Sequence, residues 1–325
     1  MTPLERALHQ RIKAEGPITV EAYMEACNSY YYSTRDPLGV GGDFTTAPEI
    51  SQMFGELVGA TLTDCWTRAG SPTDAIYVEL GPGRGTLAAD ALRVMRAGGF
   101  TGEVHFVETS PVLRELQRAA VPDAHWHETI EDLPARPLLL IANEFLDALA
   151  IHQHVEGIER RVVIAAGGLT FDRDGEIVES SPARDNAVSA ISTCLAAKGG
   201  VAIIVDYGHA PAGPGDTLQA VRDHRYASVL EKPGEQDLTA HVDFQAVARS
   251  AREAGVSVTS LMTQGDWLRA LGISIRGEAL ARANPKRREE IEAGLHRLTS
   301  GEEMGELFKV IGVHAPNWPA PPGFE

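Results

Sequence analysis

A glycine-rich turn is the first segment of this chain whose residue types and spacing could do chemistry. Residues 79–85 read Glu-Leu-Gly-Pro-Gly-Arg-Gly and follow an apolar run at 75–80 that predicts a strand. Glycines directly after a strand allow the backbone to approach a ligand closely. A dinucleotide fingerprint would need glycine at position 86, where Thr86 stands. A carboxylate such as Glu79 suits S-adenosylmethionine, whose ammonium group it can pair with; a tight structural turn is the alternative interpretation.

A second acidic residue lies at the spacing that an adenosine-bearing cofactor requires. Glu108 ends the next apolar run, 104–108, and comes 23 positions after Gly85. A carboxylate at the end of this strand accepts hydrogen bonds from the ribose hydroxyls. A surface glutamate at a strand end is common, so the prediction depends on the combination of Glu108 with the glycine turn.

A third polar group follows a buried strand. Residues 143–147 read Asn-Glu-Phe-Leu-Asp and come directly after the apolar run 138–142. In a parallel sheet the carboxyl ends of the strands form the ligand crevice, so these side chains should face the transferred methyl group. Glu144 and Asp147 could bind a guanidinium or orient a nucleophile. The alternative is structural: Asn143 would cap a helix, and Glu144 would interact with the helix dipole.

The elements that position these residues alternate between strand and helix from about residue 75 to 206, which predicts a parallel sheet covered on both faces. The expected fold is therefore a doubly wound, mostly parallel Rossmann-like sheet of the class I methyltransferase kind, with an N-terminal helical cap and inserted segments. Helices are expected at 4–14, 19–27, 50–69, 86–97, 110–119, 183–197, 241–254 and within 264–299. Further strands are expected at 124–127, 151–155, 160–165, 201–206, 256–261 and 307–313. Residues 30–49 should form a structured loop, with Tyr30 to Tyr32 interpreted as packing, and 208–240 a long irregular region.

Composition excludes several classes of function. The chain has 325 residues, 43% of them hydrophobic, and a net charge of −16, which disfavours nucleic-acid binding. Its three cysteines form no CxxC motif, and the histidine pairs 125/127 and 152/154 lack a third ligand, so no metal is expected. Neither a targeting segment nor a membrane-spanning run is evident, so we expect a cytoplasmic protein.

Several long blocks of the chain resemble the MidA family (mitochondrial dysfunction protein A), whose eukaryotic members are arginine-methylating assembly factors of respiratory complex I. The resemblance covers nearly the whole chain. It is carried by residues 42–56, 78–86, 143–149, 215–220, 237–244 and 304–310. The family implies a methyltransferase core whose cofactor, S-adenosylmethionine, lies under a cap made from the N-terminal segment, with S-adenosylhomocysteine as the product.

The resemblance also assigns expected roles by position. The expected cofactor contacts are Glu79, Gly81, Pro82, Gly83, Gly85, Thr86, Glu108, Thr109 and Asn143, with Asp43, Phe44, Thr45, Pro48 and Glu49 from the lid. The expected acceptor side contains Asn143, Glu144, Asp147, Asp206, Tyr207, His241 and Asp243, of which Asn143, Glu144, Asp147, His241 and Asp243 are the candidate catalytic residues.

We expect a single methyltransferase domain over 1–325. It would comprise a cap and lid at 1–70, a core at 74–206 and 241–315, and insertions at 207–240 and 264–299. The expected acceptor is an arginine of a protein, by resemblance a respiratory complex I subunit. A small-molecule O- or N-methyltransferase and a non-catalytic assembly factor are the alternatives. A homodimer is a further expectation.

Overall fold

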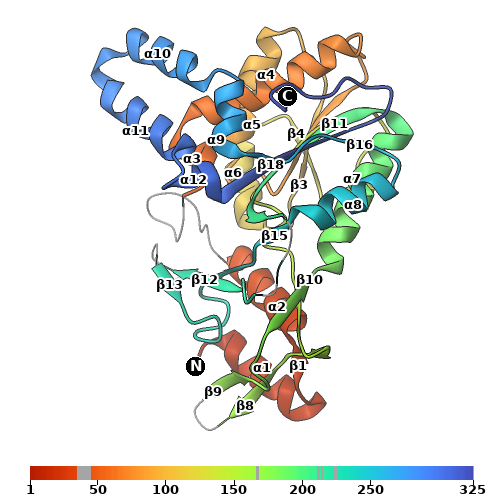
Figure 1. Ribbon diagram of the computed structural model, residues 1–325, viewed down its shortest axis with the longest axis vertical. Coiled ribbons are helices and arrows are strands. Elements are labelled where there is room, and N and C mark those ends of the chain that lie inside the picture. Colours follow the sequence, from red (N-terminus) through yellow and green to blue (C-terminus); the bar gives the residue numbers. More distant parts are fainter. Residues whose placement is uncertain (35–44, 166–167, 211–212, 214, 223–224, 325) are drawn as a thin grey trace.

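The computed structural model describes residues 1–34, 45–165, 168–210, 213, 215–222 and 225–324. Two lobes are stacked along the long axis of the molecule (Figure 1). The larger lobe, at the top of the view, contains a central sheet between helices. The smaller lobe contains the N-terminus and most of the short strands. The candidate site must be sought where the two lobes meet, because the strand ends of the large sheet point there.

The central sheet has the strand order β16-β18-β11-β5-β2-β3-β4. Neighbouring strands from β11 to β4 run parallel, while β18 lies antiparallel to β11. The strands are β2 (Ile76–Leu80), β3 (Val104–Val107), β4 (Ala124–His127), β5 (Leu138–Asn143), β11 (Gly200–His209), β16 (Ser257–Val258) and β18 (Phe308–His314), with β15 (Val242–Asp243) on β11 and β17 (Met262–Thr263) on β18. This confirms the doubly wound, mostly parallel sheet.

Helices cover both faces of the sheet because the central strands are apolar on both sides. On one face Tyr77, Leu139 and Ile203 pack against α4 (Gln52–Arg68) and α5 (Thr86–Ala97). On the other face, the alternate residues Val78 and Leu140 pack against α7 (Pro182–Lys198) and α8 (Phe244–Glu253). The period of two along each strand therefore divides the core into two layers. The remaining helix of the alternating part is α6 (Pro111–Ala120), and a short 3-10 turn, η1, spans Ile130–Asp132.

A helical hairpin projects from the large lobe, at the upper left of Figure 1. It consists of α10 (Ile273–Ala283) and α11 (Arg288–Thr299), joined by the 3-10 turn η2 (Pro285–Arg287). Two shorter helices connect the hairpin to the sheet, α9 (Gln264–Ala270) and α12 (Met304–Leu307). The helical character expected for 264–299 is confirmed.

The small lobe is built around α1 (Pro3–Glu15) and α2 (Val20–Thr34). Tyr23, Met24 and Cys27 of α2 form a separate apolar core with strand residues such as Val162 and Leu238. Three small sheets surround it. They are β1 (Ile18–Thr19) with β8 (Arg161–Ala165) and β9 (Gly168–Phe171); β6 (His152–Val155) with β7 (Ile158–Glu159) and β10 (Ile177–Ser180); and β12 (Gln219–Arg222) with β13 (Arg225–Ala227) and β14 (Asp237–Thr239).

Three parts of the fold differ from the sequence-based expectation. The helix α2 runs to Thr34 rather than ending near residue 27, because its aromatic turn is held by tertiary packing that local propensity does not register. The region expected to be irregular, 208–240, contains β12, β13 and β14. These strands have three or four residues each, too few for an alternating pattern to be recognised. The expected strand 256–261 contributes only β16 to the sheet.

Candidate active site

The glycine turn connects β2 to α5 with three glycines in the left-handed region. Gly81, Gly83 and Gly85 have φ values of +59°, +54° and +81°. A Cβ atom on Gly81 would lie 3.2 Å from the Phe145 ring, and one on Gly85 would lie 3.1 Å from the Ala120 Cβ atom. The turn is therefore held close to two neighbouring segments. Gly85 acts in packing against α6, and it does not line the cavity described next.

A cavity of about 370 Å³ opens above this turn. Most of the residues expected to contact the cofactor line it: Pro48, Glu49, Glu79, Gly81, Pro82, Gly83, Thr86, Glu108, Thr109 and Asn143. Thr45 lines a neighbouring cavity instead. Asp43 and Phe44 lie outside the described residues. We call this space the cofactor cavity.

Glu79 is a buried acid at the base of the cofactor cavity. It is 3% exposed, and its Oε2 accepts a hydrogen bond of 2.6 Å from the Tyr77 hydroxyl. Burial raises the pKa of Glu79 to about 8, because desolvation disfavours the charged form. A bound cation would reverse this effect, so Glu79 fits the ammonium group of an amino-acid-like ligand.

Glu108 is fixed by donors from the N-cap and the body of α6. Its Oε1 accepts from the Ser110 amide at 2.7 Å, and its Oε2 accepts from Gln117 Nε2 at 3.1 Å. The same Gln117 nitrogen donates to the Gly83 carbonyl at 2.8 Å, which ties the acid to the glycine turn. Burial raises the pKa of Glu108. A ligand hydroxyl in the cavity could donate to the Glu108 carboxylate, whose position these hydrogen bonds fix.

The opposite wall of the cofactor cavity comes from the N-terminal 50 residues. Thr86 Oγ1, in the first turn of α5, donates to Glu49 Oε1 at 2.5 Å and so holds α3 (Ala47–Ile50) over the glycine turn. Asn28, Ser29, Tyr32 and Ser33 of α2 line the same cavity.

The contribution of α2 is a part of the site that sequence reasoning missed. Asn28 is 7% exposed, and its amide group bonds to both the Ala148 and Leu238 carbonyls. Ser110 Oγ donates to the Tyr32 carbonyl at 2.6 Å. The only sequence signal is a polar residue next to an apolar helix face, and the helix expected at 19–27 ends just before it.

A second cavity, of about 430 Å³, adjoins the first. Tyr32 and Glu144 line both cavities, so they stand at the boundary between them. The second cavity is acidic and aromatic within: its walls include Asp147, Tyr207, Asp237, His241 and Phe308. We call it the acceptor cavity.

Glu144 has an unusual backbone conformation. Its φ is +51°, in the left-handed region that non-glycine residues rarely adopt, and such strain clusters at functional sites. Its Oε1 accepts from Asn143 Nδ2 at 3.1 Å and from the Ala47 amide at 3.4 Å. Burial, followed by the nearby Asp147, raises the pKa of Glu144 to about 8. Among the described residues, both donors to this carboxylate are neutral.

Two buried oxygens at the boundary lack partners. Asn143 Oδ1 and Asp147 Oδ1 accept no hydrogen bond within the described part of the chain. Burial raises the pKa of Asp147 to about 6. Because an unsatisfied buried acceptor is costly, both atoms fit ligands that bring N–H donors. Asn143 faces the cofactor cavity and Asp147 the acceptor cavity.

Asp206 and Arg184 hold the turn that carries these groups. Asp206 Oδ2 accepts from the amides of Leu146 and Asp147 at 2.9 and 3.2 Å. Arg184, which sequence reasoning missed, is 7% exposed and donates to four backbone carbonyls, those of Leu146, Asp147, Ala240 and His241. The arginine joins the turn after β5 to the segment before α8. No pattern in the sequence of α7 predicts that Arg184 binds these carbonyls.

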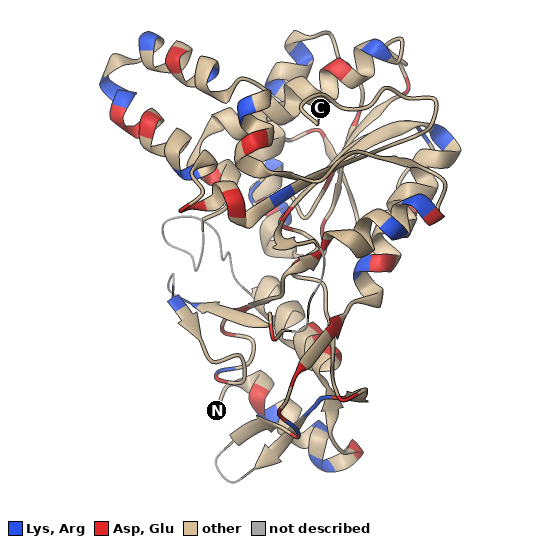
Figure 2. Cartoon of the chain, viewed as in Figure 1, with Lys and Arg blue, Asp and Glu red and all other residues tan. Residues whose placement is uncertain are grey.

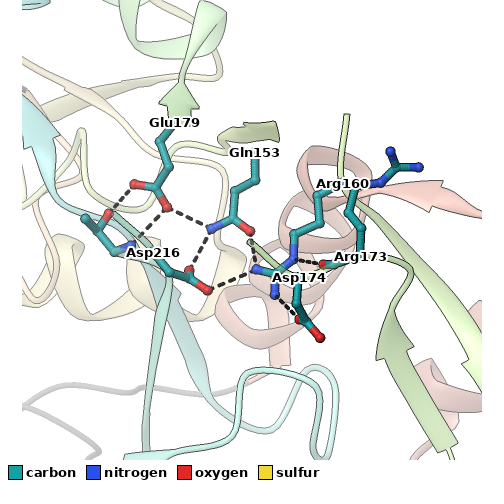
Figure 3. Close-up of polar contacts among 7 residues, drawn as sticks. Gln153, Arg160, Arg173, Asp174, Glu179 and Asp216 are labelled. Atoms are coloured by element: carbon teal, nitrogen blue, oxygen red, sulfur yellow. Dashed lines mark hydrogen bonds and ion pairs between the residues drawn. The ribbon is translucent and has the colours of Figure 1, made fainter. Parts of the chain in front are cut away.

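A polar network in the small lobe joins Arg160, Gln153, Glu179 and Asp216 (Figure 3). Arg160 donates to Asp216 Oδ2 at 2.9 Å and to Gln153 Oε1 at 3.0 Å. Gln153 donates to Glu179 Oε1 at 2.8 Å, and Glu179 accepts from the Thr217 amide at 3.0 Å. Thr217 Oγ1 then accepts from the amide of His241. The network fixes both ends of the segment 216–241, which forms one wall of the cavity.

The remaining candidate catalytic residues occupy different places. The His241 ring lies edge-on to Tyr207, with 5.5 Å between ring centroids, and it lines the acceptor cavity. Burial lowers the pKa of His241. Asp243 instead caps α8, since its Oδ1 accepts from the amides of Gln245 and Ala246. It lines a third cavity on the far side of His241 and not the acceptor cavity.

Within the described ranges, no group of three or more His, Cys, Asp or Glu side chains is arranged to hold a metal ion. No helix in the same ranges is long and apolar enough to cross a membrane. His152, which the sequence pairs with His154, instead contacts Glu21 and Glu159.

The doubly wound sheet, the glycine turn and the acids Glu79 and Glu108 at the carboxyl ends of β2 and β3 define an S-adenosylmethionine-dependent methyltransferase. The fold agrees with a solved structure from Burkholderia thailandensis, a protein bound to S-adenosyl-homocysteine. That structure has a TM-score of 0.83 and 24% identity, and the match covers 99% of this chain and 92% of that one. The likeness supports the fold of all parts described above.

Family membership follows from the sequence comparisons. Residues 57–167 and 156–262 match the model of the family described as "Putative S-adenosyl-L-methionine-dependent methyltransferase". The relatives include protein arginine methyltransferase NDUFAF7 homolog, mitochondrial, of Drosophila melanogaster, which is 34% identical over 95% of this chain and 84% of its own length. Protein arginine methyltransferase NDUFAF7, mitochondrial, of Danio rerio is 34% identical over 94% of this chain and 85% of its own. The chain belongs to this methyltransferase family, and its cofactor is S-adenosylmethionine.

Proposed function

We propose that this methyltransferase methylates an arginine nitrogen of a protein acceptor. The observation that carries the proposal is a pair of carboxylates, the half-buried Glu144 and the buried Asp147, in a cavity that adjoins the cofactor cavity. Within the described residues neither has an ion-pair partner, and burial raises the pKa of both. A guanidinium is always charged and presents five donors, so it can satisfy both acids at once. The names of the relatives support the same acceptor.

We propose the following division of roles in the cofactor cavity. Glu79 and Asn143 Oδ1 bind the ammonium group of the cofactor, and Glu108 accepts from its ribose hydroxyls. The glycine turn, with Pro82 and Thr86, lies along the cofactor, while Thr109 borders the adenosine side. The helix α2 and the segment with Pro48 and Glu49 act as the cap. The support is the burial of the two acids and the unpartnered oxygen of Asn143.

Methyl transfer requires alignment more than acid–base power. When bound, S-adenosylmethionine supplies an electrophilic methyl group on a positively charged sulfur. Glu144 and Tyr32, at the boundary of the cavities, orient one guanidinium nitrogen towards that carbon. The C–S bond breaks as the N–C bond forms, which leaves neutral S-adenosylhomocysteine. Glu144 accepts the proton released from the nitrogen. Holding the reacting atoms in line is worth about 7–11 kcal/mol of the barrier.

The finer identity of the acceptor and the compartment are further parts of the proposal. A complex I subunit, suggested by the family resemblance, is the first protein acceptor to test. The three cysteines are free thiols, which fits the reducing cytoplasm that we expect, although the relatives are named mitochondrial proteins. A homodimer stays a prediction that size-exclusion chromatography with light scattering would test.

The cofactor roles can be tested by isothermal titration with S-adenosylmethionine. We expect the wild-type protein to bind at micromolar concentration and both Glu79→Ala and Glu108→Ala to lose at least tenfold in affinity, about 1.4 kcal/mol. Glu176→Ala, an exposed residue that does not line the cofactor cavity, is the control. Unchanged affinity in both variants would refute the assigned roles.

The acceptor can be tested by incubating the protein with a methyl-labelled cofactor and a proteome extract. We expect label in methylarginine after acid hydrolysis. Labelled product that passes through an ultrafiltration membrane would favour a small-molecule acceptor. Label in lysine or in carboxyl esters would refute arginine as the acceptor.

A further inference from the structure

We propose that the protein acceptor carries an acidic side chain close in sequence to the methylated arginine, and that Arg225 and Arg297 bind that side chain. This inference rests on the proposed function, because it concerns the neighbourhood of the same arginine. The acceptor cavity holds carboxylates deep inside, namely Glu144 and Asp147, and the two arginines line the same cavity as exposed residues. The acceptor cavity can therefore bind a cation at its carboxylates and an anion at its two exposed arginines.

These two arginines differ from the arginines of the helical hairpin that form ion pairs. Arg282, Arg287 and Arg288 belong to the helical hairpin or its turn, and each pairs with a glutamate three or four residues away. Arg297 lies in the last turn of α11 and has no hydrogen-bond or ion-pair partner within the described ranges. The same holds for Arg225 on β13, which is equally exposed. Both guanidinium groups remain available to an external anion.

The two groups come from different lobes. Figure 2 shows basic positions on β13 in the small lobe and along the α10–α11 hairpin of the large lobe. Residues of both elements line the acceptor cavity, so a bound segment would contact both lobes. Tyr226, which follows Arg225, is 80% exposed and offers an aromatic surface to the same segment. Exposed aromatic and arginine side chains are typical anchors of protein-binding surfaces.

The charge of the whole protein makes these two positions selective. The chain carries a net charge of −16, so an acidic peptide is repelled over most of the surface. Arg225 and Arg297 provide local positive charge at the mouth of an otherwise acidic cavity. Opposite charges across such a surface contribute mainly to specificity and orientation. A basic residue beside the target arginine would be disfavoured by the same two groups.

The experiment compares nine-residue peptides with a central arginine flanked by Glu, Gln or Lys two positions away on each side. Initial rates with S-adenosylmethionine give kcat and KM for each peptide. Binding of fluorescein-labelled peptides in the presence of S-adenosylhomocysteine is measured by anisotropy, so that a slow peptide is still informative. The proteins are the wild type, the double variant Arg225→Gln/Arg297→Gln and the charge-reversed double variant Arg225→Glu/Arg297→Glu. Arg282→Gln is the matched control on the same hairpin.

We expect the wild type and Arg282→Gln to prefer the Glu peptide over the Gln peptide about tenfold, with the difference in KM rather than kcat. Each exposed ion pair contributes up to about fivefold. The glutamine double variant should bring the preference close to one, and charge reversal should favour the Lys peptide. Equal use of all peptides by the wild type, or an unchanged preference in the double variant, would overturn this inference alone. No binding or methylation of any arginine peptide, together with no methylarginine in proteome extracts, would overturn the proposed function as well.

Discussion

Two glutamates of this protein, the buried Glu56 and the half-buried Glu144, have opposite electrostatic surroundings. Glu56 lies in α4 and is 3% exposed; Arg276 Nε and Nη2 donate to its two oxygens at 2.6 and 2.7 Å, and Arg93 Nη1 donates at 2.8 Å. The arginines hold the pKa of Glu56 at about 2. The donors to Glu144 in the described part of the chain are both neutral, and burial raises its pKa to about 8.

The difference separates a structural acid from one that awaits a ligand. The ion group around Glu56 is complete within the chain and joins the α10–α11 hairpin to α4. In the described part of the chain neither the Glu144 nor the Asp147 side chain forms an ion pair, although the charge of Arg184 acts on Asp147, so a cationic acceptor would stabilise both acids further. Buried acids with raised pKa values and no partner mark functional sites, whereas fully paired acids mark structural ones.

The largest effect should come from Glu144→Gln. The change keeps the shape of the side chain but removes the charge that binds the guanidinium and accepts its proton. We expect kcat/KM for an arginine acceptor to fall about 100- to 1000-fold, with the affinity for S-adenosylmethionine within about twofold of wild type. Glu156→Gln is the control, since Glu156 is an exposed glutamate with the same φ of +51°. Full turnover by the Glu144→Gln variant would show that Glu144 does not bind the acceptor.

The next effect is on stability, and it concerns the other glutamate. Glu56→Gln leaves Arg276 and Arg93 without their acid. We expect the free energy of unfolding in urea to fall by about 2 kcal/mol, less than for a fully buried pair because the two arginine side chains are 37% and 50% exposed. Glu278→Gln, which breaks an exposed pair with Arg282, should leave the midpoint close to wild type. Equal stability of Glu56→Gln and wild type would mean that the hairpin is held by apolar packing alone.

The two glutamates should also give opposite pH dependences of stability in the ligand-free protein. The pKa of Glu56 falls from 4.5 to about 2 on folding, so its stabilisation is present above pH 4.5 and is lost as the pH falls through 2. The pKa of Glu144 rises from 4.5 to about 8, so its contribution is favourable below pH 4.5 and is lost as the pH rises through 8. Melting temperatures between pH 3 and 9 should therefore show Glu144→Gln gaining on wild type towards pH 9, and Glu56→Gln approaching wild type towards pH 3. Parallel curves for the three proteins would contradict both assignments.

The smallest effect should follow from breaking the polar network of the small lobe. Arg160→Met keeps contact with Phe171, over whose ring the guanidinium lies at 3.7 Å, but removes the bonds to Asp216 and Gln153. The segment 216–241 would be less firmly placed, and we expect KM for the acceptor to rise about threefold while the affinity for the cofactor stays the same. Arg161→Met, an exposed neighbour, is the control. A loss of cofactor affinity instead would show that the network acts on the whole site.

Much of the fold and of the cofactor site could be predicted because their signals are local. The apolar run of β2, the glycines after it and Glu79 stand next to one another in the sequence, and the parallel sheet brings Glu108 and Asn143 to the same edge. Other features depend on contacts between distant segments. The position of Tyr32, the four carbonyl bonds of Arg184 and the left-handed backbone of Glu144 have no local pattern from which they could be derived.

Some expected residues took other places for physical reasons. Gly85 is needed for close packing on α6, Asp243 satisfies the first amides of α8, and Thr45 lines the acceptor cavity. A motif gives the position of a residue along the chain, but neighbouring helices decide which cavity the side chain lines.

The acceptor cavity takes residues from both ends of the chain, since Tyr32 of α2 and Phe308 of β18 both line it. The last strand, β18, is also inserted between β11 and β16 in the central sheet. During translation the earlier parallel strands can assemble as they leave the ribosome, but the cavity wall and the sheet stay incomplete until β18 has also emerged. The central sheet and the acceptor cavity are therefore completed by the same late strand.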